Sequence, residues 1–323
     1  MPMRLAAGAP AARILAFGGY QPARVVTNDD LAATIDTSDQ WIRSRVGVAR
    51  RRIAAADETV ADMAVAAGGK ALATSGISAA DIDLVIVATC TQEAQIPNAS
   101  AVVAHRLGIR APGAYDINAA CAGFCYGLAG ASDAIRAGSA HQALVIGAEK
   151  LSSWVDWTDR STCIIFADGA GAAVVAAAQT ADEVGVGPVV WGSAGEHADK
   201  IFITDRRSFI FQEGQTVFRW ATTALAPTAR AACERAGVDP ADLAAFVPHQ
   251  ANLRIVEAIA RQLKAKNAIV ADDIVDSGNT SSASIPLALA RMIEKGAIGS
   301  GQPVLIIGFG AGLTYAAQVI MTP

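Results

Sequence analysis

The feature that most constrains the fold of this chain is an internal repeat. Three pairs of matching segments align at one offset of 161 residues (237 minus 76), about half of the 323-residue chain. The pairs are Gly76 with Gly237, Asp81 with Asp242, and ALVIGA at 143–148 with VLIIGF at 304–309. Three matches at one offset indicate a duplicated structural unit. We therefore expect two similar halves, residues 1–182 and 183–323, interlocked in one compact body because no Pro- or Ser-rich linker separates them.

The segments between these matches predict a layered α/β fold. Short apolar runs rich in Val and Ile, such as LVIVAT and VLIIGF, are typical of strands buried on both faces. Ala-rich segments of helical length lie between such runs, at 99–108 and 127–138, and small side chains let helices pack closely against a sheet. The composition, 52% hydrophobic and 17% charged, excludes a disordered chain. We expect helices sandwiched between two sheets.

The same offset also pairs two polar junctions. It aligns Asn118 with Asn279 and Cys121 with Ser282, so DINAACAGF and SGNTSSASI occupy equivalent strand-to-helix junctions that would converge on one cleft. A cysteine at a helix N-terminus is favoured as the thiolate. A Cys, a His and an Asn far apart in sequence form a candidate set for nucleophilic catalysis. We predict that Cys121, His249 and Asn279 form a catalytic site.

The two halves differ in the connection that follows this junction. The matching ends FADGAGAAVV (166–175) and FGAGLTYAAQ (309–318) align at a smaller offset than the rest of the repeat. The first half therefore carries about 20 extra residues around 149–168, and such insertions are usually loops that carry function.

Each catalytic candidate has a structural alternative. A buried cysteine is usually an inert small hydrophobe. We interpret four cysteines in this way, namely Cys90, Cys125, Cys163 and Cys233. His249 follows an apolar run and could be a core histidine, and Asn279 beside Gly278 could form a turn. The repeat alignment favours the active-site interpretation of both.

Charge and cysteine content limit the function. A net charge of −4 gives no electrostatic support for nucleic-acid binding. The five cysteines are an odd number without the spacing of a zinc site, so we expect no metal and a reducing, cytoplasmic location. The most apolar stretch, 167–178, is too short to span a bilayer, and the Gly and Pro residues among the first 20 positions argue against a targeting peptide.

Seven segments together carry a resemblance to a known family. They are TSDQWIRSRVGVARRRIA (37–54), DINAACAGF (116–124), TDRSTCIIFADGAGAA (158–173), EGQTVFRWA (213–221), VPHQANLRI (247–255), GNTSSASIPLAL (278–289) and IGFGAG (307–312). In this order they resemble the β-ketoacyl-acyl carrier protein synthase III enzymes, and among them the actinobacterial type. The resemblance implies an α/β, thiolase-like, five-layered αβαβα fold with two pseudo-duplicated halves.

The resemblance also implies a reaction. Cys121 would accept an acyl group from acyl-coenzyme A, and malonyl-acyl carrier protein would then lose CO2 and attack the thioester. Neutral His249 and the Asn279 amide would donate hydrogen bonds to the oxygen that gains charge. The backbone N–H groups of Cys121 and Ala311 would form the oxyanion hole for acyl transfer. No cofactor is expected besides the two substrates, and a homodimer is expected.

Further positions match the family's binding surfaces. The coenzyme A contacts would be Trp41, Arg45, Arg160, Phe218 and Asn252. The carrier-protein contacts would be Arg219, Gln250, Arg254 and Arg261. An alternative for the WIRSR segment is an amphipathic helix with a solvated basic edge.

The acyl pocket is where the chain departs from acetyl-selective relatives. Ile96 and Phe166 match the pocket positions, and Ile96 stands where those relatives often carry Phe, at a dimer interface that closes the partner's pocket. A smaller side chain enlarges that pocket, so we expect branched or longer primers to be accepted.

Two other function classes remain open. One is an acyltransferase on the same scaffold that moves the acyl group to an alcohol or amine without decarboxylation. The other is a non-catalytic partner subunit, which should have lost its nucleophile. The intact GNTSS and the retained Cys121 favour condensation over both.

Overall fold

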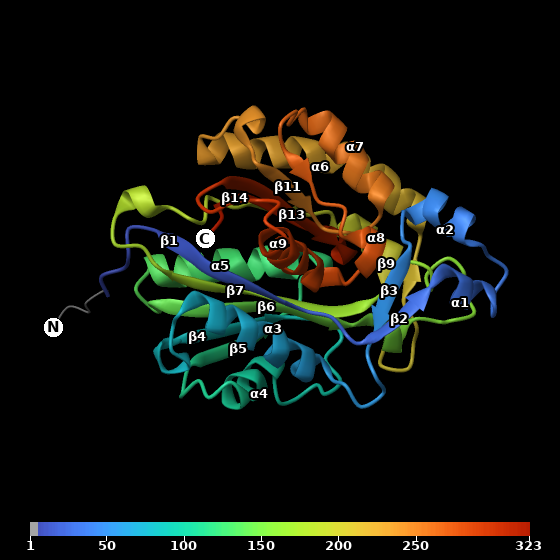
Figure 1. Cartoon of the computed structure of the whole chain (residues 1–323), viewed down its shortest axis with the longest axis horizontal. Coiled ribbons are helices and arrows are strands. Elements are labelled where there is room, and N and C mark those ends of the chain that lie inside the picture. The colour runs from blue at the N-terminus through green and yellow to red at the C-terminus, as the bar shows by residue number, and fades with distance from the viewer. Residues whose placement is uncertain (1–5) are drawn as a thin grey trace.

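The computed structural model describes residues 6–323 and shows two five-stranded sheets stacked with helices (Figure 1). The first sheet has the order β1-β7-β6-β4-β5, and the second has the order β12-β11-β13-β14-β8. The first contains β1 (Ala12–Tyr20), β4 (Leu84–Ala88), β5 (Gly113–Ile117), β6 (Gln142–Lys150) and β7 (Asp168–Ala177). The second contains β8 (Val190–Ser193), β11 (Ala245–Pro248), β12 (Ile269–Val270), β13 (Pro303–Gly310) and β14 (Thr314–Met321). The two sets of strands lie on opposite sides of the boundary expected at 182/183.

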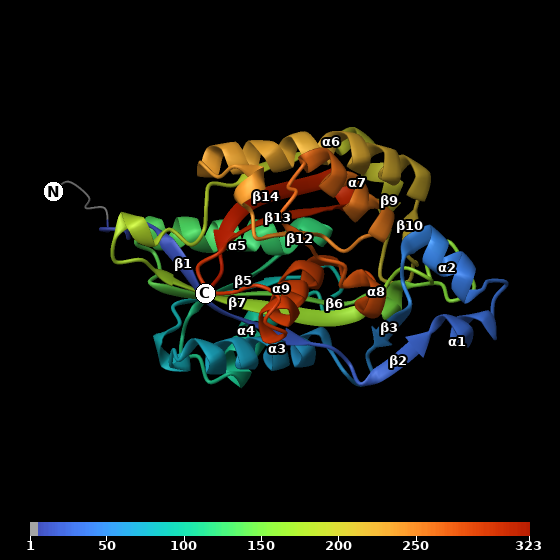
Figure 2. The same ribbon diagram turned by 45° about the horizontal axis from the view of Figure 1, so that its top comes forward.

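Three clusters of buried side chains fill the spaces between five layers. One joins α3 and α4 to the outer face of the first sheet, and another joins α6 and α7 to the outer face of the second. The third holds α5 and α9 between the two sheets (Figure 2). The bounds are α3 (Val60–Ser75), α4 (Ala99–Arg106), α5 (Gly123–Arg136), α6 (Gly214–Ala236), α7 (Leu253–Leu263) and α9 (Ser284–Glu294). The five-layered αβαβα expectation is confirmed.

A smaller group of elements lies at one end of the layers, beside the insertion that follows β6 (Figure 1). Its side chains form a fourth buried cluster with residues of the insertion. The elements are β2 (Arg24–Thr27), α1 (Asn28–Ala32), α2 (Asp39–Val46), β3 (Arg50–Ile53) and α8 (Ile274–Ser277), with the hairpin β9 (Ile201–Phe202) and β10 (Phe211–Gln212) nearby. No helix among residues 6–323 is long and apolar enough to cross a membrane. The expectation on a targeting peptide concerns the first 20 positions, of which 1–5 lie outside the described residues.

The strand register reproduces the repeat. Leu84 of β4 pairs with Ala143 of β6, and Ala245 of β11 pairs with Val304 of β13, both in parallel. The two partners shift by the same 161 residues (245 minus 84, and 304 minus 143). The predicted duplication therefore extends to individual backbone pairs.

Two equivalent glycines let the halves approach closely. A Cβ on Gly147 of β6 would lie 2.4 Å from the carbonyl oxygen of Ser282, and a Cβ on Gly308 of β13 would lie 2.9 Å from the Cα of Ala122. The backbone of β6 thus contacts the junction of the second half, and the backbone of β13 contacts the junction of the first half. The equivalent placement of these two glycines has a packing cause, because any side chain there would push the two junctions apart.

Substitution of Gly147 by alanine is expected to lower the free energy of unfolding by about 1–3 kcal/mol, because its Cβ overlaps a backbone atom that cannot rotate away. Gly69→Ala in α3 is the matched control. Its Cβ would meet Leu107 at an ordinary 3.6 Å, so a gain in helix propensity should stabilise the protein slightly. Urea unfolding of both variants measures the difference. Equal stability of the two variants would contradict the close approach.

Candidate active site

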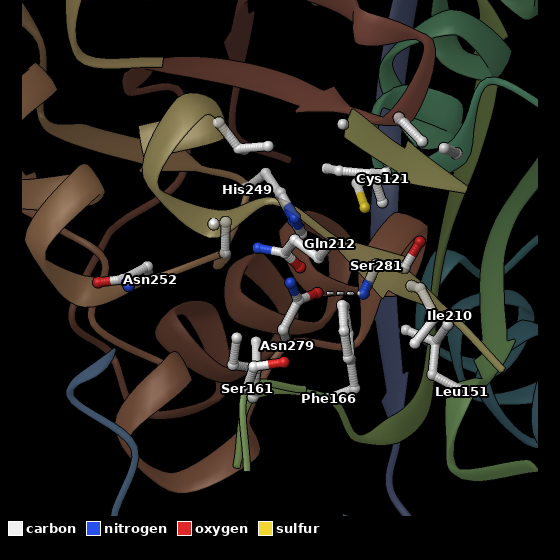
Figure 3. A pocket seen from close by; sticks show the side chains of 18 of the residues that line it. Cys121, Leu151, Ser161, Phe166, Ile210, Gln212, His249, Asn252, Asn279 and Ser281 are labelled. Carbon is white, nitrogen blue, oxygen red and sulfur yellow. Dashed lines mark hydrogen bonds between the residues drawn. The ribbon is translucent and has the colours of Figure 1, made fainter. Parts of the chain in front are cut away.

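The two junctions and the end of β11 bring the three predicted catalytic residues to one cavity (Figure 3). Cys121 lies in the short helix Ala120–Ala122 just before α5, His249 follows β11, and Asn279 precedes the short helix Ser281–Ala283. The cavity has a volume of about 1050 Å³. The expected convergence is confirmed.

Both junctions contain a residue in the left-handed region. Ala120 has a φ of 46° and Ser281 a φ of 50°, and the two positions differ by the repeat offset. Non-glycine residues in this conformation cost free energy and occur where surrounding structure holds them, often at functional sites. These two residues belong to the short helices Ala120–Ala122 and Ser281–Ala283, and both line the cavity.

His249 is a buried, neutral hydrogen-bond donor. Its side chain is 1% exposed, its ring packs edge-on against Phe309 at 5.2 Å, and burial lowers its pKa to about 3. Its Nδ1 lies 2.7 Å from the Oγ of Ser284, which also accepts the N–H of Gln250. Among residues 6–323 the Ser284 hydroxyl proton has no other bonded acceptor, so it donates to Nδ1 and leaves the ring proton on Nε2.

The buried His249 makes stability depend on pH. The unfolded chain takes up a proton as the pH falls below 6.5, whereas the folded chain does so only near pH 3, so the stability contributed is full above pH 6.5 and is lost towards pH 3. We expect this group to lower the free energy of unfolding by about 2 kcal/mol between pH 7 and pH 5. In His249→Gln, the free energy of unfolding measured in urea should not show this decrease between pH 7 and pH 5. The same pH dependence in both proteins would contradict a depressed pKa.

Asn279 is fixed through its backbone and its side-chain oxygen. Its N–H donates to Ile165 O and its carbonyl accepts from Ala167 N–H, both at 2.9 Å. Its Oδ1 accepts from the N–H of Ser281 at 2.8 Å (Figure 3). These bonds assign the side-chain amide without ambiguity and leave Nδ2 as the donor towards the cavity.

Cys121 corrects one expectation. A thiolate was expected at the helix N-terminus, but burial raises the pKa of the Cys121 thiol to about 12. Removal of the thiol from water disfavours its charged form. Gly310 provides the space, since a Cβ there would lie 2.8 Å from that of Cys121. Ala311, the other expected backbone donor, lines the same cavity.

The expected coenzyme A positions gather at the cavity mouth. The guanidinium carbons of Arg45 and Arg160 lie 5.5 and 4.7 Å from the centre of the Trp41 ring, within cation–π range. Phe218 and Asn252 line the same cavity. Arg160 comes from the insertion after β6, so that loop reaches the site as predicted.

The expected carrier positions divide into surface and interior. Arg219 and Arg254 line the mouth, where Arg254 lies 5.2 Å from the Phe218 ring centre, and Arg261 is exposed on α7. The assignment of Gln250 is wrong. Its side chain is 1% exposed and so cannot meet a carrier protein. The side-chain amide donates to the carbonyls of Pro248 and Ala271 and accepts from the N–H of Ile274, which ties together the buried backbone next to His249.

The two expected acyl-pocket residues also lie apart. Phe166 is buried and lines the cavity, whereas Ile96 is 84% exposed and lies outside the lining of its own chain's cavity. Leu151, Ile210 and Gln212 line it too and were not predicted (Figure 3). Leu151 belongs to the predicted insertion, but the residues near the β9–β10 hairpin carry no sequence signal for a pocket.

No cluster of His, Cys, Asp and Glu within residues 6–323 could hold a metal ion. The structure pairs none of the five cysteines in a disulfide, and Cys125, Cys163 and Cys233 are buried. Cys90 lines the cavity beside Cys121, which the sequence interpretation did not foresee.

Comparison with known proteins agrees with this site. Residues 115–195 match the family described as 3-oxoacyl-[acyl-carrier-protein] synthase III, and residues 233–322 match its C-terminal family. The chain is 57% identical to β-ketoacyl-[acyl-carrier-protein] synthase III 4 of Streptomyces coelicolor, over 96% of this chain and 98% of the relative.

Solved structures give the same answer. The priming β-ketosynthase of the R1128 polyketide pathway superposes with a TM-score of 0.96 at 41% identity, over 100% of this chain and 99% of that one. The 3-oxoacyl-[acyl-carrier-protein] synthase III of Aquifex aeolicus superposes with a TM-score of 0.91 at 38% identity, over 97% of this chain and 100% of that one. Fold and site together define a condensing enzyme of the thiolase fold. The chain belongs to the β-ketoacyl-[acyl-carrier-protein] synthase III family, as its sequence resemblance indicated.

Proposed function

We propose that this protein condenses an acyl-coenzyme A primer with malonyl-acyl carrier protein, with loss of CO2, to give a β-ketoacyl-acyl carrier protein. This reaction initiates fatty acid or polyketide synthesis and makes the protein an acyltransferase. The observation that carries the proposal is a thiol, a neutral imidazole N–H and a fixed carboxamide N–H around one cavity. The names of its relatives describe the same chemistry.

Acyl transfer requires a nucleophile and a place for negative charge. Cys121 Sγ attacks the thioester carbonyl, and the coenzyme A thiol leaves. The backbone N–H groups of Cys121 and Ala311 stabilise the carbonyl oxygen in the tetrahedral intermediate. The acyl chain lies against Phe166.

Decarboxylation requires donors at a different oxygen. As CO2 leaves, charge develops on the malonyl thioester oxygen, where His249 Nε2–H and Asn279 Nδ2–H donate. His249 acts as a neutral donor, because burial holds its pKa near 3 and its Nδ1 accepts from Ser284. The resulting carbanion bonds the acyl carbon on Cys121, the bond from that carbon to the Cys121 sulfur breaks, and the released thiolate takes up a proton from water.

The substrates reach the site through the basic mouth. Adenine stacks on Trp41 beside Arg45 and Arg160, and the pantetheine arm passes Phe218 and Asn252. Arg219, Arg254 and Arg261 offer positive charge to an acidic carrier protein.

The remaining expectations stay proposals as well. The reaction needs no cofactor beyond its two substrates, because the thiol and two neutral donors suffice for each step. Five free thiols favour a cytoplasmic protein. In a homodimer, the exposed Ile96 would pack against the partner subunit and close its acyl pocket.

Intact-protein mass spectrometry tests the reaction directly. The protein is incubated separately with acetyl-, butyryl- and isobutyryl-coenzyme A, and malonyl-acyl carrier protein is then added. We expect one acyl adduct on Cys121 that disappears only with the malonyl carrier. An adduct that persists and transfers to an alcohol or amine supports the non-decarboxylating class, and no adduct from any donor supports a non-catalytic subunit.

The primer preference follows from Ile96. We expect kcat/KM for isobutyryl- and butyryl-coenzyme A to match or exceed that for acetyl-coenzyme A, since each methylene that the pocket buries contributes about 0.8 kcal/mol. Ile96→Phe should move the ratio towards acetyl-coenzyme A. A wide acetyl preference in the unaltered protein would disprove the enlarged pocket.

A further inference from the structure

Gln212 is a polar side chain in the cavity that the proposed reaction does not use. It belongs to β10 and lines the cavity together with Cys121, His249 and Asn279. Figure 3 shows it in view between His249 and Asn279. Its backbone pairs with Ile201, but its carboxamide bonds no group among residues 6–323. A carboxamide without an internal partner is free to bind a substrate.

The strand that carries Gln212 is held in place. Glu213 N–H donates to Lys200 O at 2.8 Å, and the Glu213 carboxylate lies 2.9 Å from Lys200 Nζ. On the other side, Phe211 is 48% exposed and lies outside the cavity lining. Because neighbouring residues of a strand point to opposite faces, Gln212 is directed into the cavity. Gly214 has no side chain, and even a Cβ there would lie 4.0 Å from Gln212 Nε2, so the amide has room for a ligand.

The malonyl group brings a charge for which the proposed reaction names no partner. Its thioester oxygen meets His249 and Asn279, and its carboxylate lies one methylene further on. A carboxylate that leaves water without a hydrogen bond is costly. The charged residues that line the cavity lie at its mouth or on the exposed turn between β9 and β10, namely Arg45, Arg160, Arg219, Arg254, Asp205 and Arg206. Gln212 offers a neutral donor inside.

We propose that Gln212 Nε2–H donates to the malonyl carboxylate and so selects malonyl over uncharged thioesters as the second substrate. This inference rests on the proposed condensation. When the bond between the methylene carbon and the carboxylate carbon breaks, its electron pair passes to the thioester as an enolate. The carboxylate leaves as neutral CO2, and the amide keeps its protons.

A neutral amide suits this position better than a cation. Charge leaves the carboxylate in the transition state, so a strong ion pair would stabilise the bound substrate more than the transition state and slow the step. A hydrogen bond from an amide admits the carboxylate and is weaker than an ion pair, so it gives way more easily as CO2 forms. Gln212 therefore determines specificity, and its bond contributes to affinity instead of rate.

Two inert thioethers of coenzyme A test the contact without any reaction. 2-Carboxyethyl-coenzyme A has the malonyl skeleton with a methylene in place of the thioester carbonyl, and propyl-coenzyme A carries a methyl group in place of the carboxylate. Isothermal titration gives a Kd for each, and their ratio isolates the carboxylate. In Gln212→Met, which has a similar shape but no donor, the Kd of the carboxyethyl compound should rise about tenfold. The Kd of the propyl compound should stay unchanged.

Two further variants sharpen the comparison. Gln212→Glu keeps the shape and repels a carboxylate, so it should weaken the carboxyethyl compound more than Gln212→Met does. Gln215→Met is the matched control, because Gln215 lines the same cavity from the exposed first turn of α6. It should leave the ratio of the two Kd values unchanged. If Gln212→Met does not fold by thermal melting, Gln212→Glu decides.

A single turnover of the preloaded acyl-enzyme separates affinity from rate. In Gln212→Met, the concentration of malonyl-acyl carrier protein that gives half the maximal rate should rise about tenfold, and the maximal rate should not fall. A lower maximal rate at unchanged half-saturation would overturn the inference. So would an equal loss of affinity for both thioethers, which would place Gln212 against the pantetheine arm that they share. The titrations need no condensation, so an altered ratio in a protein that does not decarboxylate would refute the proposed function and keep this contact.

Discussion

Cys121→Ala is expected to abolish acyl transfer and to leave the fold intact. The substitution removes the only atom that forms the thioester, so turnover should fall by a factor on the order of 10⁴ or more. The cost in stability should be small, because Cys121 lies on the wall of an open cavity and its removal creates no closed void. Mass spectrometry should show no acyl adduct, and thermal unfolding should change little.

The matched control is Cys233→Ala in α6. That thiol is buried in the outer layer, away from the cavity, so the variant should lose some stability and keep the adduct and the turnover. Unaltered turnover in Cys121→Ala, or an adduct located on the neighbouring Cys90, would refute Cys121 as the nucleophile.

Asn279→Ala is expected to separate the two half-reactions. Its amide faces the malonyl thioester oxygen in the proposed mechanism, so decarboxylation should slow by about 10²–10³, the usual cost of removing one oxyanion donor. Acyl loading should stay within a few-fold, since the N–H groups of Cys121 and Ala311 serve that step. A preloaded acyl-enzyme mixed with malonyl-acyl carrier protein in a single turnover measures decarboxylation alone.

Asn279→Asp sharpens the result. The carboxylate can keep the bond from Ser281 N–H and the backbone bonds to Ile165 and Ala167, but it donates nothing and repels the developing charge. Decarboxylation should therefore be slower in this variant than in Asn279→Ala. Equal slowing of loading and decarboxylation in either variant would argue that Asn279 only shapes the junction.

Much of the architecture could be read from the chain. The repeat predicted two equivalent halves, and the backbone pairs of Leu84 and Ala245 carry the same offset. It also predicted that Cys121 and Asn279 converge, because equivalent junctions of a duplicated fold meet at its pseudo-twofold axis. The long connection in the first half likewise delivers Arg160 to the mouth.

The interior of the site could not be read in the same way. His249 and Gln250 are adjacent in a single motif, yet one faces the cavity and the other turns beneath it to bond Pro248 and Ala271. Ser284 carries no sequence signal for its bond to His249, since an ordinary hydroxyl acquires such a partner only from what packs beside it.

The sequence by itself determined the duplicated α/β scaffold and the equivalent junctions that carry Cys121 and Asn279, because periodicity and repeat spacing are properties of the chain. Only the tertiary structure decided the protonation states of the Cys121 thiol and the His249 ring. Burial holds the Cys121 thiol and the His249 ring neutral, against the thiolate that a helix N-terminus alone would favour. Desolvation depends on how many atoms of both halves surround a group, and that is fixed only when the halves close around the cavity.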